Sequence, residues 1–334
     1  MSVRKIVLLF AGLVVSAVAS AQFYSGGEDP ASVRWSVSRS AHYKLIYPRG
    51  MDTLARVYAR ALEYYRPLEA PSSGYLPGGM YRRPLPVVLH AFGGSSNGSV
   101  AWAPMRMDLY TLPEAYGPEP LPWTASLAVH ENRHVSQMQF GADGWFKPFK
   151  WLTGELFAGA MAGIYPGSWF LEGDAVVAET ALTPYGRGRR GDFLNYYRAA
   201  FDQGDWRNWY RWRHGSWRRY APNHYALGYL TLAGARYLYD EPLFTADYLR
   251  GAARHPLRLR HIQRAFRRTS GKKFQPAFRD IMQTFQDLWT AENRGPWTPG
   301  EALDPAPAWY TVQASPLFFD GSLARLEHSK IRPT

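Results

Sequence analysis

The sequence predicts an α+β protein in which a small mixed β-sheet subdomain is followed by a mainly helical subdomain. Residues 22–120 are rich in short alternating segments typical of strands. From about Leu121 to Arg294, apolar residues recur at helical spacing between Pro and Gly breaks near positions 148, 166, 184, 222 and 256. The 334 residues, 46% apolar and 16% aromatic, suffice for one large or two moderate domains with a packed core.

Residues 1–21 have the organisation of a secretory signal peptide. Arg4 and Lys5 precede an apolar run at 6–15, and residues 19–21 read Ala-Ser-Ala, a small-x-small cleavage site. The run is shorter than the roughly 20 residues that a membrane-spanning helix needs, so cleavage is favoured over an uncleaved anchor. We therefore expect an exported protein, periplasmic or extracellular. The absence of cysteine excludes a disulfide framework and any thiolate metal site.

The elements of the predicted sheet follow in order. Strands are expected around Trp35 and Val37, at 42–47 and at 86–91, with a helix from Asp52 between the last two. Positions 97–98 read Asn-Gly, a tight-turn signal, and the segment 101–112 after them is a candidate edge strand. Further on, the apolar stretch 151–165 is too short to span a membrane and is expected to be a buried helix.

Residues 130–134 read His-Glu-Asn-Arg-His, an H-E-x-x-H motif, between a helix start signal at Pro122 and a stop signal at Gly141. Residues four apart lie on the same face of a helix, so the imidazoles of His130 and His134 can bind one tetrahedral metal ion. Glu131 is then placed to reach a water molecule on that ion. The competing interpretation is an amphipathic helix with two polar-paired histidines at the edge of a core.

Glu172 is the candidate third ligand, because zinc hydrolases of this kind combine two histidines with one carboxylate. We expect it in the first turn of a helix that Ser168 caps and that ends before Pro184. Glu179, seven residues on, falls on the same face and could accept a hydrogen bond from the back of a ligating imidazole. In the alternative interpretation, Glu172 is a carboxylate stabilised by the helix dipole and Glu179 is exposed to solvent. The apolar surroundings and Gly173, which permits close backbone approach, argue against that alternative.

The H-E-x-x-H motif, followed at 169–175 by Trp-Phe-Leu-Glu-Gly-Asp-Ala and by a further Glu, resembles the gluzincin metallopeptidases, and more narrowly the bacterial exported peptidase MA-like proteins. The metzincin pattern is excluded because Gln137 and Phe140 stand where its Gly and third His would be. The resemblance implies a zincin-like metallopeptidase fold and a Zn²⁺ ion held by His130, His134 and Glu172. It also implies Glu131 as the general base in the hydrolysis of a peptide or protein substrate.

Two further expectations come from the resemblance. A Tyr or His of a later helix stabilises the tetrahedral intermediate in these peptidases, which implies Tyr225, with His224 and Tyr229 as alternatives. The edge strand holds the substrate, which would place residues 101–105 beside the peptide. Such proteins often continue into a TolB-like β-propeller, and residues 309–330 are similar to a first blade. We therefore expect 295–334 to be a Pro-rich linker and a β-hairpin turning at 320–321, the start of a truncated propeller.

The formal charge of +12 at pH 7 is most commonly explained by a solvated basic face, and an anionic partner is the alternative explanation. Arginines and aromatic residues alternate at 206–220 and a second basic run occupies 258–273, so an anionic envelope surface is a candidate partner. No sequence-specific nucleic-acid binding is expected, because no recognised motif accompanies the charge. The alternative to a peptidase is a non-catalytic envelope binding or scaffold protein on a zincin-like fold.

Overall fold

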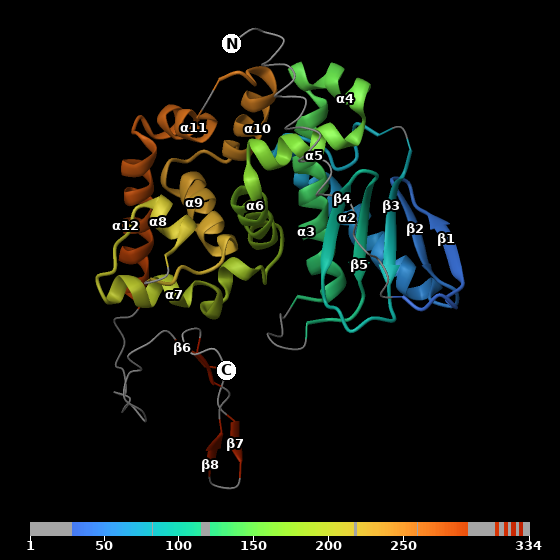
Figure 1. Ribbon diagram of the computed structural model, residues 1–334, viewed down its shortest axis with the longest axis horizontal. Coiled ribbons are helices and arrows are strands. Elements are labelled where there is room, and N and C mark those ends of the chain that lie inside the picture. Colours follow the sequence, from blue (N-terminus) through green and yellow to red (C-terminus); the bar gives the residue numbers. More distant parts are fainter. Residues whose placement is uncertain are drawn as a thin grey trace.

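The computed structural model describes residues 29–81, 83–114, 121–216, 219–258 and 260–292, and four short strands between 311 and 329. Within these residues the chain is a mixed α/β structure, with a five-stranded sheet at one side and helices filling the other (Figure 1). The predicted signal peptide and most of the predicted linker lie outside the described residues. No described helix combines the length and the apolar character needed to cross a bilayer.

The sheet has the order β1-β2-β3-β5-β4. Its strands are β1 (Trp35–Arg39), β2 (Tyr43–Pro48), β3 (Leu85–His90), β4 (Gly98–Trp102) and β5 (Met105–Tyr110). The three inner strands β2, β3 and β5 are parallel, and the two edge strands are each antiparallel to their neighbour. Alternate residues of the inner strands are fully buried, which is the pattern of a sheet with one face in a core.

The single edge strand predicted at 101–112 is wrong, because this segment belongs to two strands. The chain reverses at Ala103–Pro104, not at the Asn-Gly pair, so that Trp102 of β4 pairs with Met105 of β5. Proline lacks the N–H that a continuous strand would use there. Strand β4 forms the edge, and β5 is internal. Of the residues predicted to lie beside a substrate, only Ala101 and Trp102 belong to the edge strand.

Two helices connect the sheet to the rest of the molecule. Helix α2 (Asp52–Ser73) packs on β2 and ends at Gly74 in a left-handed conformation. Helix α3 (Trp123–Met138) packs against α2 and is buried on every side from Ser126 onward. Two motif residues of α3 face α2: Asn132 donates a hydrogen bond to the backbone oxygen of Leu62 at 3.0 Å, and Arg133 donates to the backbone oxygen of Glu69 at 3.1 Å.

The helical part follows α3, as the sequence predicts. Its helices are α4 (Lys147–Thr153), α5 (Glu155–Ile164), α6 (Gly167–Leu182), α7 (Gly191–Asp202), α8 (Trp209–His214), α9 (His224–Leu238), α10 (Phe244–Arg254), α11 (His261–Ser270) and α12 (Phe274–Glu292). Helices α6 and α9 make the largest contact. Their backbones touch at Gly173 and Gly228, where a Cβ on either residue would overlap the other helix. The close approach expected at Gly173 is therefore confirmed.

One sequence prediction in this part is wrong, and the structure adds detail to a second. The stretch 151–165 is not one buried helix: it divides at Gly154, whose φ is +72°, and the side chain of Trp151 is 88% exposed. In the segment 206–220, the rings of Trp209 and Trp212 are buried, and Arg207 lies over the Trp212 ring and pairs with Asp205. These two rings form part of the core, whereas Trp206 and Tyr210 of the same segment are 39% and 46% exposed. The anionic partner expected for this segment stays a prediction.

Near the C-terminal end, β7 (Leu317–Phe319) pairs antiparallel with β8 (Ser322–Ala324), and β6 (Thr311–Gln313) pairs with β9 (Glu327–Ser329). The β7–β8 pair brackets positions 320–321, where the sequence predicts the turn. A propeller stays a prediction.

Candidate metal centre

Three candidate ligand atoms converge between α3 and α6. The two Nε2 atoms of His130 and His134 are 3.0 Å apart, and Oε2 of Glu172 lies 3.2 Å from the first and 3.3 Å from the second. Among the described residues, these three form the one group of histidine and carboxylate side chains close enough to share a metal ion. The structure thus brings together the three residues that are predicted from the sequence to be ligands.

The donor set and its dimensions fit a zinc ion. Bonds of about 2.0–2.1 Å in tetrahedral geometry separate neighbouring ligand atoms by about 3.3 Å, close to the spacing found here. Two imidazole nitrogens and one carboxylate oxygen suit zinc and other first-row metals, and leave one tetrahedral position open. Residues present in the site are therefore compatible with a catalytic zinc ion.

Glu172 reaches the histidines from the second turn of α6, not the first as predicted. The helix begins at Gly167, one residue before the expected cap, and Ser168 does not cap it. Gly167 has a φ of +66°, which lets the chain enter the helix directly after Pro166. Burial opposes ionisation of Glu172, but the two histidines outweigh it and hold the pKa of Glu172 far below its ordinary value.

Glu179 accepts a hydrogen bond of 2.6 Å from Nδ1 of His130, which is the contact that the sequence suggests. Its other oxygen accepts from Nε of Arg187 at 2.9 Å. Glu179 is 1% exposed, so it is not a solvated carboxylate. Burial acts to raise its pKa, but the Arg187 charge prevails and lowers the pKa to about 2. An ionised Glu179 fixes the ring of His130 with Nε2 directed at the site.

His134 has a different support, which the sequence analysis missed. Its Nδ1 lies 2.9 Å from Oε1 of Gln137, and the Gln137 amide donates to Oδ2 of Asp174 at 2.8 Å. Asp174 also forms a bidentate pair with Arg133, at 2.6 and 2.9 Å. The three-residue spacing from His134 to Gln137 on one helix could have indicated this contact. No signal in the sequence identifies Arg187, which lies in a short 3-10 helix beyond Pro184.

Glu131 lies beside this triangle and against the edge strand. It is 2% exposed, and its Oε2 is buried without a hydrogen-bond partner. Its Oε1 would be 2.5 Å from a Cβ at Gly98, the first residue of β4, so glycine makes room for the carboxylate. Burial raises the pKa of Glu131 above its ordinary value. A carboxylate in such surroundings is suited to accept a proton at neutral pH.

Of the three candidates on α9, Tyr225 lies at the site. Its ring stacks at 6.5 Å from the His130 ring, with the Arg187 guanidinium 5.2 Å away. Burial, followed by the charge and hydrogen bond of Glu172, raises the pKa of Tyr225. The hydroxyl therefore stays protonated. His224 is half-buried beside Tyr225, and Tyr229 is buried with its ring against Gly188 and Phe193.

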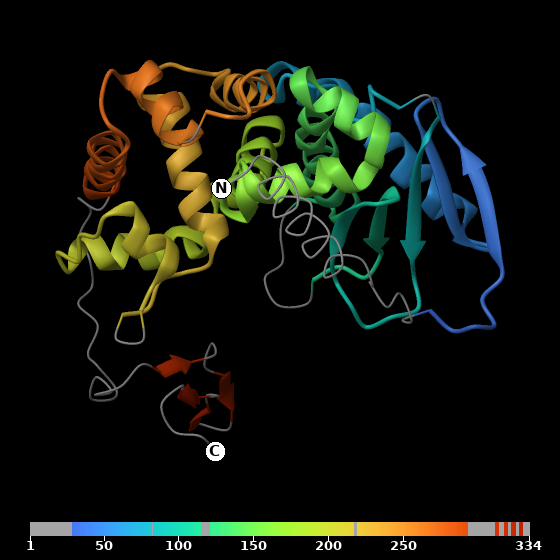
Figure 2. The same cartoon turned by 45° about the horizontal axis from the view of Figure 1, so that its top comes forward.

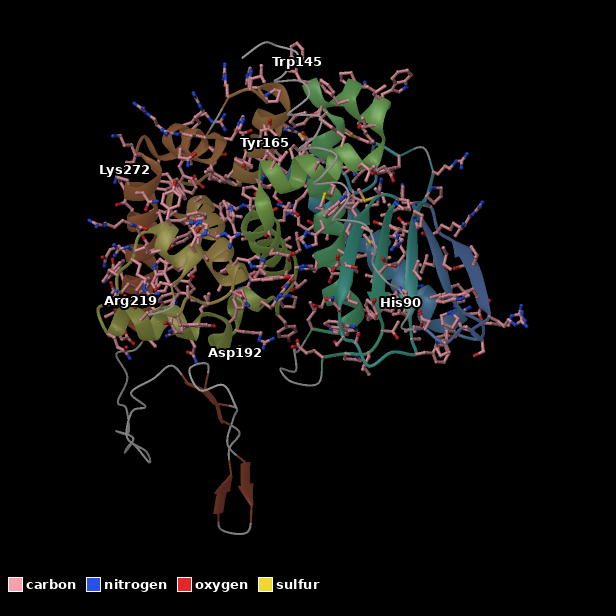
Figure 3. The ribbon with its side chains drawn as sticks, in the orientation of Figure 1. His90, Trp145, Tyr165, Asp192, Arg219 and Lys272 are labelled. Atoms are coloured by element: carbon pink, nitrogen blue, oxygen red, sulfur yellow. The ribbon has the colours of Figure 1, made fainter. Side chains whose placement is uncertain are left out.

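The candidate ligands lie in a cleft of about 720 Å³ that separates the sheet from the helical part. Strand β4 forms one wall, through Gly98, Ser99, Val100 and Trp102. The opposite wall comes from α5, α6, α7 and α9, and Asp192 of α7 marks its lower rim (Figure 3). An edge strand, a buried carboxylate and a candidate metal centre therefore share one cleft. No protein-family model, curated protein or solved structure matches this chain.

Proposed function

We propose that the protein is an exported zinc metallopeptidase of the gluzincin type, with a zincin-like fold, that hydrolyses peptide bonds. One observation supports this above the others: the triangle of His130, His134 and Glu172 adjoins a buried carboxylate, Glu131, that has no partner for one oxygen. A non-catalytic scaffold has no use for such a costly group.

A zinc ion bound by these three residues would supply a Lewis acid that acidifies a water molecule and polarises a carbonyl group. Glu131 is placed to accept a proton from a water molecule in the cleft and to deliver it to the leaving amine, a role that its raised pKa favours. Tyr225 donates a hydrogen bond to the oxyanion as the carbonyl carbon becomes tetrahedral. Glu179 and Gln137 hold the two imidazoles in place.

Strand β4 supplies the binding surface for the substrate. It is the edge strand of the sheet and lines the cleft, so its outward N–H and C=O groups are directed at the space beside Glu131. An extended peptide can pair with these groups as an additional strand. This arrangement binds the backbone of the substrate and suits peptides of many sequences.

The proposal is tested by metal content and peptide hydrolysis in three proteins. We expect about one zinc per chain in the wild type and in Glu131→Gln, with hydrolysis at least about 10³-fold slower in the variant. Glu172→Ala should lose the metal as well as the activity. Inductively coupled plasma mass spectrometry and a fluorogenic peptide library provide the two readouts. A wild type without metal after zinc addition contradicts the proposal, and metal binding without hydrolysis of any peptide or protein leaves the scaffold function.

A further inference from the structure

Helix α4 exposes an unusual set of large apolar side chains. None of its seven residues is buried, and Trp151, Leu152 and Phe149 are 88%, 74% and 52% exposed. Trp145, two residues before the helix, is 67% exposed and projects from the upper edge of the molecule (Figure 3). Four such side chains within eight residues form a patch of the kind that marks an interaction site.

This patch continues into the loop between α10 and α11. Gly144, beside Trp145, packs so closely on α10 that a Cβ there would lie 2.6 Å from the backbone oxygen of Ala253. Tyr165, just after α5, donates a hydrogen bond of 2.8 Å to the backbone oxygen of Pro256. Leu257, which follows Pro256 in the chain, is 94% exposed. Helices α4, α10 and α11 accordingly lie along the same side of the molecule in Figures 1 and 2.

The surroundings of the patch are strongly basic. We call residues 145–152, 254–258 and 260–273 the docking face. These ranges contain no Asp or Glu, and their cationic residues are Lys147, Lys150, Arg254, Arg258, Arg260, Arg264, Arg267, Arg268, Lys272 and Lys273. Apart from Lys150, all of these side chains are exposed. Arg268 pairs with Asp247 and Lys272 with Asp280, two carboxylates outside the docking face, and the ten cationic residues of the face outnumber these two acidic partners.

We propose that the docking face binds the surface of an anionic phospholipid bilayer. Tryptophan, phenylalanine and leucine side chains enter the boundary between headgroups and acyl chains, while lysine and arginine attract acidic headgroups. The aliphatic Leu152 and Leu257 distinguish this surface from one that binds nucleic acid, because they offer no ring on which a base could stack. This inference does not depend on the peptidase activity.

The test is flotation of the full chain with vesicles made of equal parts phosphatidylglycerol and phosphatidylcholine, compared with phosphatidylcholine alone. We expect binding to the anionic vesicles that weakens as salt rises. Replacing both apolar side chains in Trp151→Ser/Leu152→Ser should reduce the affinity about tenfold or more. Replacing three charges in Arg254→Gln/Arg258→Gln/Arg267→Gln should reduce it roughly a hundredfold, at about fivefold per charge.

Matched controls come from residues outside the docking face. Tyr64 of α2 is 66% exposed, so Tyr64→Ser removes another large exposed aromatic ring. Arg34, Arg39 and Arg49 are exposed around the β1–β2 hairpin, so replacing all three by Gln makes the same change of charge. Both controls should bind vesicles as the wild type does. Residues 1–21 are common to every protein compared, and binding through them would be insensitive to all of these substitutions.

Three results would overturn the inference. Equal binding to neutral and anionic vesicles contradicts the role of the charges, and unchanged binding by both docking-face variants contradicts the role of the face itself. A change in self-association by light scattering, without a change in vesicle binding, would identify the patch as a contact between copies of this chain. Circular dichroism of each variant shows whether it is folded, and because the two variants alter different exposed side chains, either one alone can decide the test.

Discussion

Gln137 links His134 to the buried ion pair between Arg133 and Asp174. Its amide accepts from the imidazole and donates to Asp174, and so sets the orientation of the ring. Gln137→Leu keeps the approximate size of the side chain and removes both bonds, together with a third from the amide to the backbone oxygen of Leu171 at 3.0 Å. We expect zinc affinity to fall about 10- to 100-fold, measured by competition with a chromogenic chelator.

Gln139→Leu is the matched control, because Gln139 is also buried but bonds to the backbone of Val135 and Met80 instead. Its zinc affinity should stay within a factor of a few of the wild type. If both variants lost zinc equally, the effect would come from general disruption of the end of α3 and not from His134.

Glu69 has a second residue-scale consequence, for stability against pH. It is completely buried beside Arg133, and burial, only partly offset by that arginine, raises its pKa from 4.5 to about 7. Because the folded pKa exceeds the unfolded one, the folded state favours the protonated form. The associated stability is complete below about pH 4.5 and is lost as pH rises through 7.

The side chain of Glu69→Gln cannot ionise. The free energy of unfolding of this variant should therefore rise relative to that of the wild type between pH 5 and pH 8. The gain should be on the order of 3 kcal/mol, measured by urea denaturation at the two pH values. A difference between the two proteins that does not change with pH would mean that Arg133 keeps Glu69 ionised throughout.

At the scale of elements, the contact between β4 and α3 controls the position of Glu131. A Cβ at Gly98 would lie 2.5 Å from Oε1 of Glu131 and 2.8 Å from Cδ2 of Leu127. Gly98→Ala should therefore displace the carboxylate and lower kcat by about tenfold or more, with zinc content preserved. Steady-state kinetics with metal analysis measures both.

Gly94→Ala serves as the control, since a Cβ there meets no atom within 4 Å. It should leave kcat unchanged. Full activity in Gly98→Ala would show that the strand or the carboxylate can shift without loss of kcat. It would contradict the role of β4 in positioning Glu131.

The sequence predicts elements well where the pattern is local. The H-E-x-x-H helix follows from periodicity and flanking signals, and α3 runs between the predicted limits. Two elements could not be placed correctly from the pattern. The chain turns at Pro104, and β5 lies between β3 and β4, a placement that depends on a strand distant in the sequence. Helix α4 separates from α5 at Gly154, whose positive φ is one of several conformations open to glycine. Alternation and apolar content alone do not contain this information.

At the scale of the whole molecule, the candidate centre joins elements far apart in the sequence. Its ligands belong to α3 and α6, its buried carboxylate adjoins β4, and Tyr225 comes from α9. The sequence supplied the ligand residues through their spacing and a family resemblance. It could not supply the cleft, because the wall opposite β4 depends on how α6 and α9 pack at Gly173 and Gly228.

Metal removal should consequently weaken the whole fold. A ligand at about 1,000 times its dissociation constant adds roughly 4 kcal/mol to stability, which corresponds to about 10 °C in Tm for a chain of this size. Calorimetry with and without a zinc chelator should show this shift in the wild type. Glu172→Ala lacks a ligand, so its Tm should not respond to the chelator; an equal response would point to zinc bound elsewhere.

The burial of α3 has a consequence for how freely this protein can vary. A search pattern treats the two middle positions of H-E-x-x-H as wild cards, yet here Asn132 bonds to Tyr43 and Leu62, and Arg133 to Glu69 and Asp174. A library randomised at 132 and 133 should lose nearly all its members to misfolding, whereas one randomised at 149 and 151 should retain most of them. In this chain, we expect positions 132 and 133 to be among the residues of the motif that tolerate substitution least.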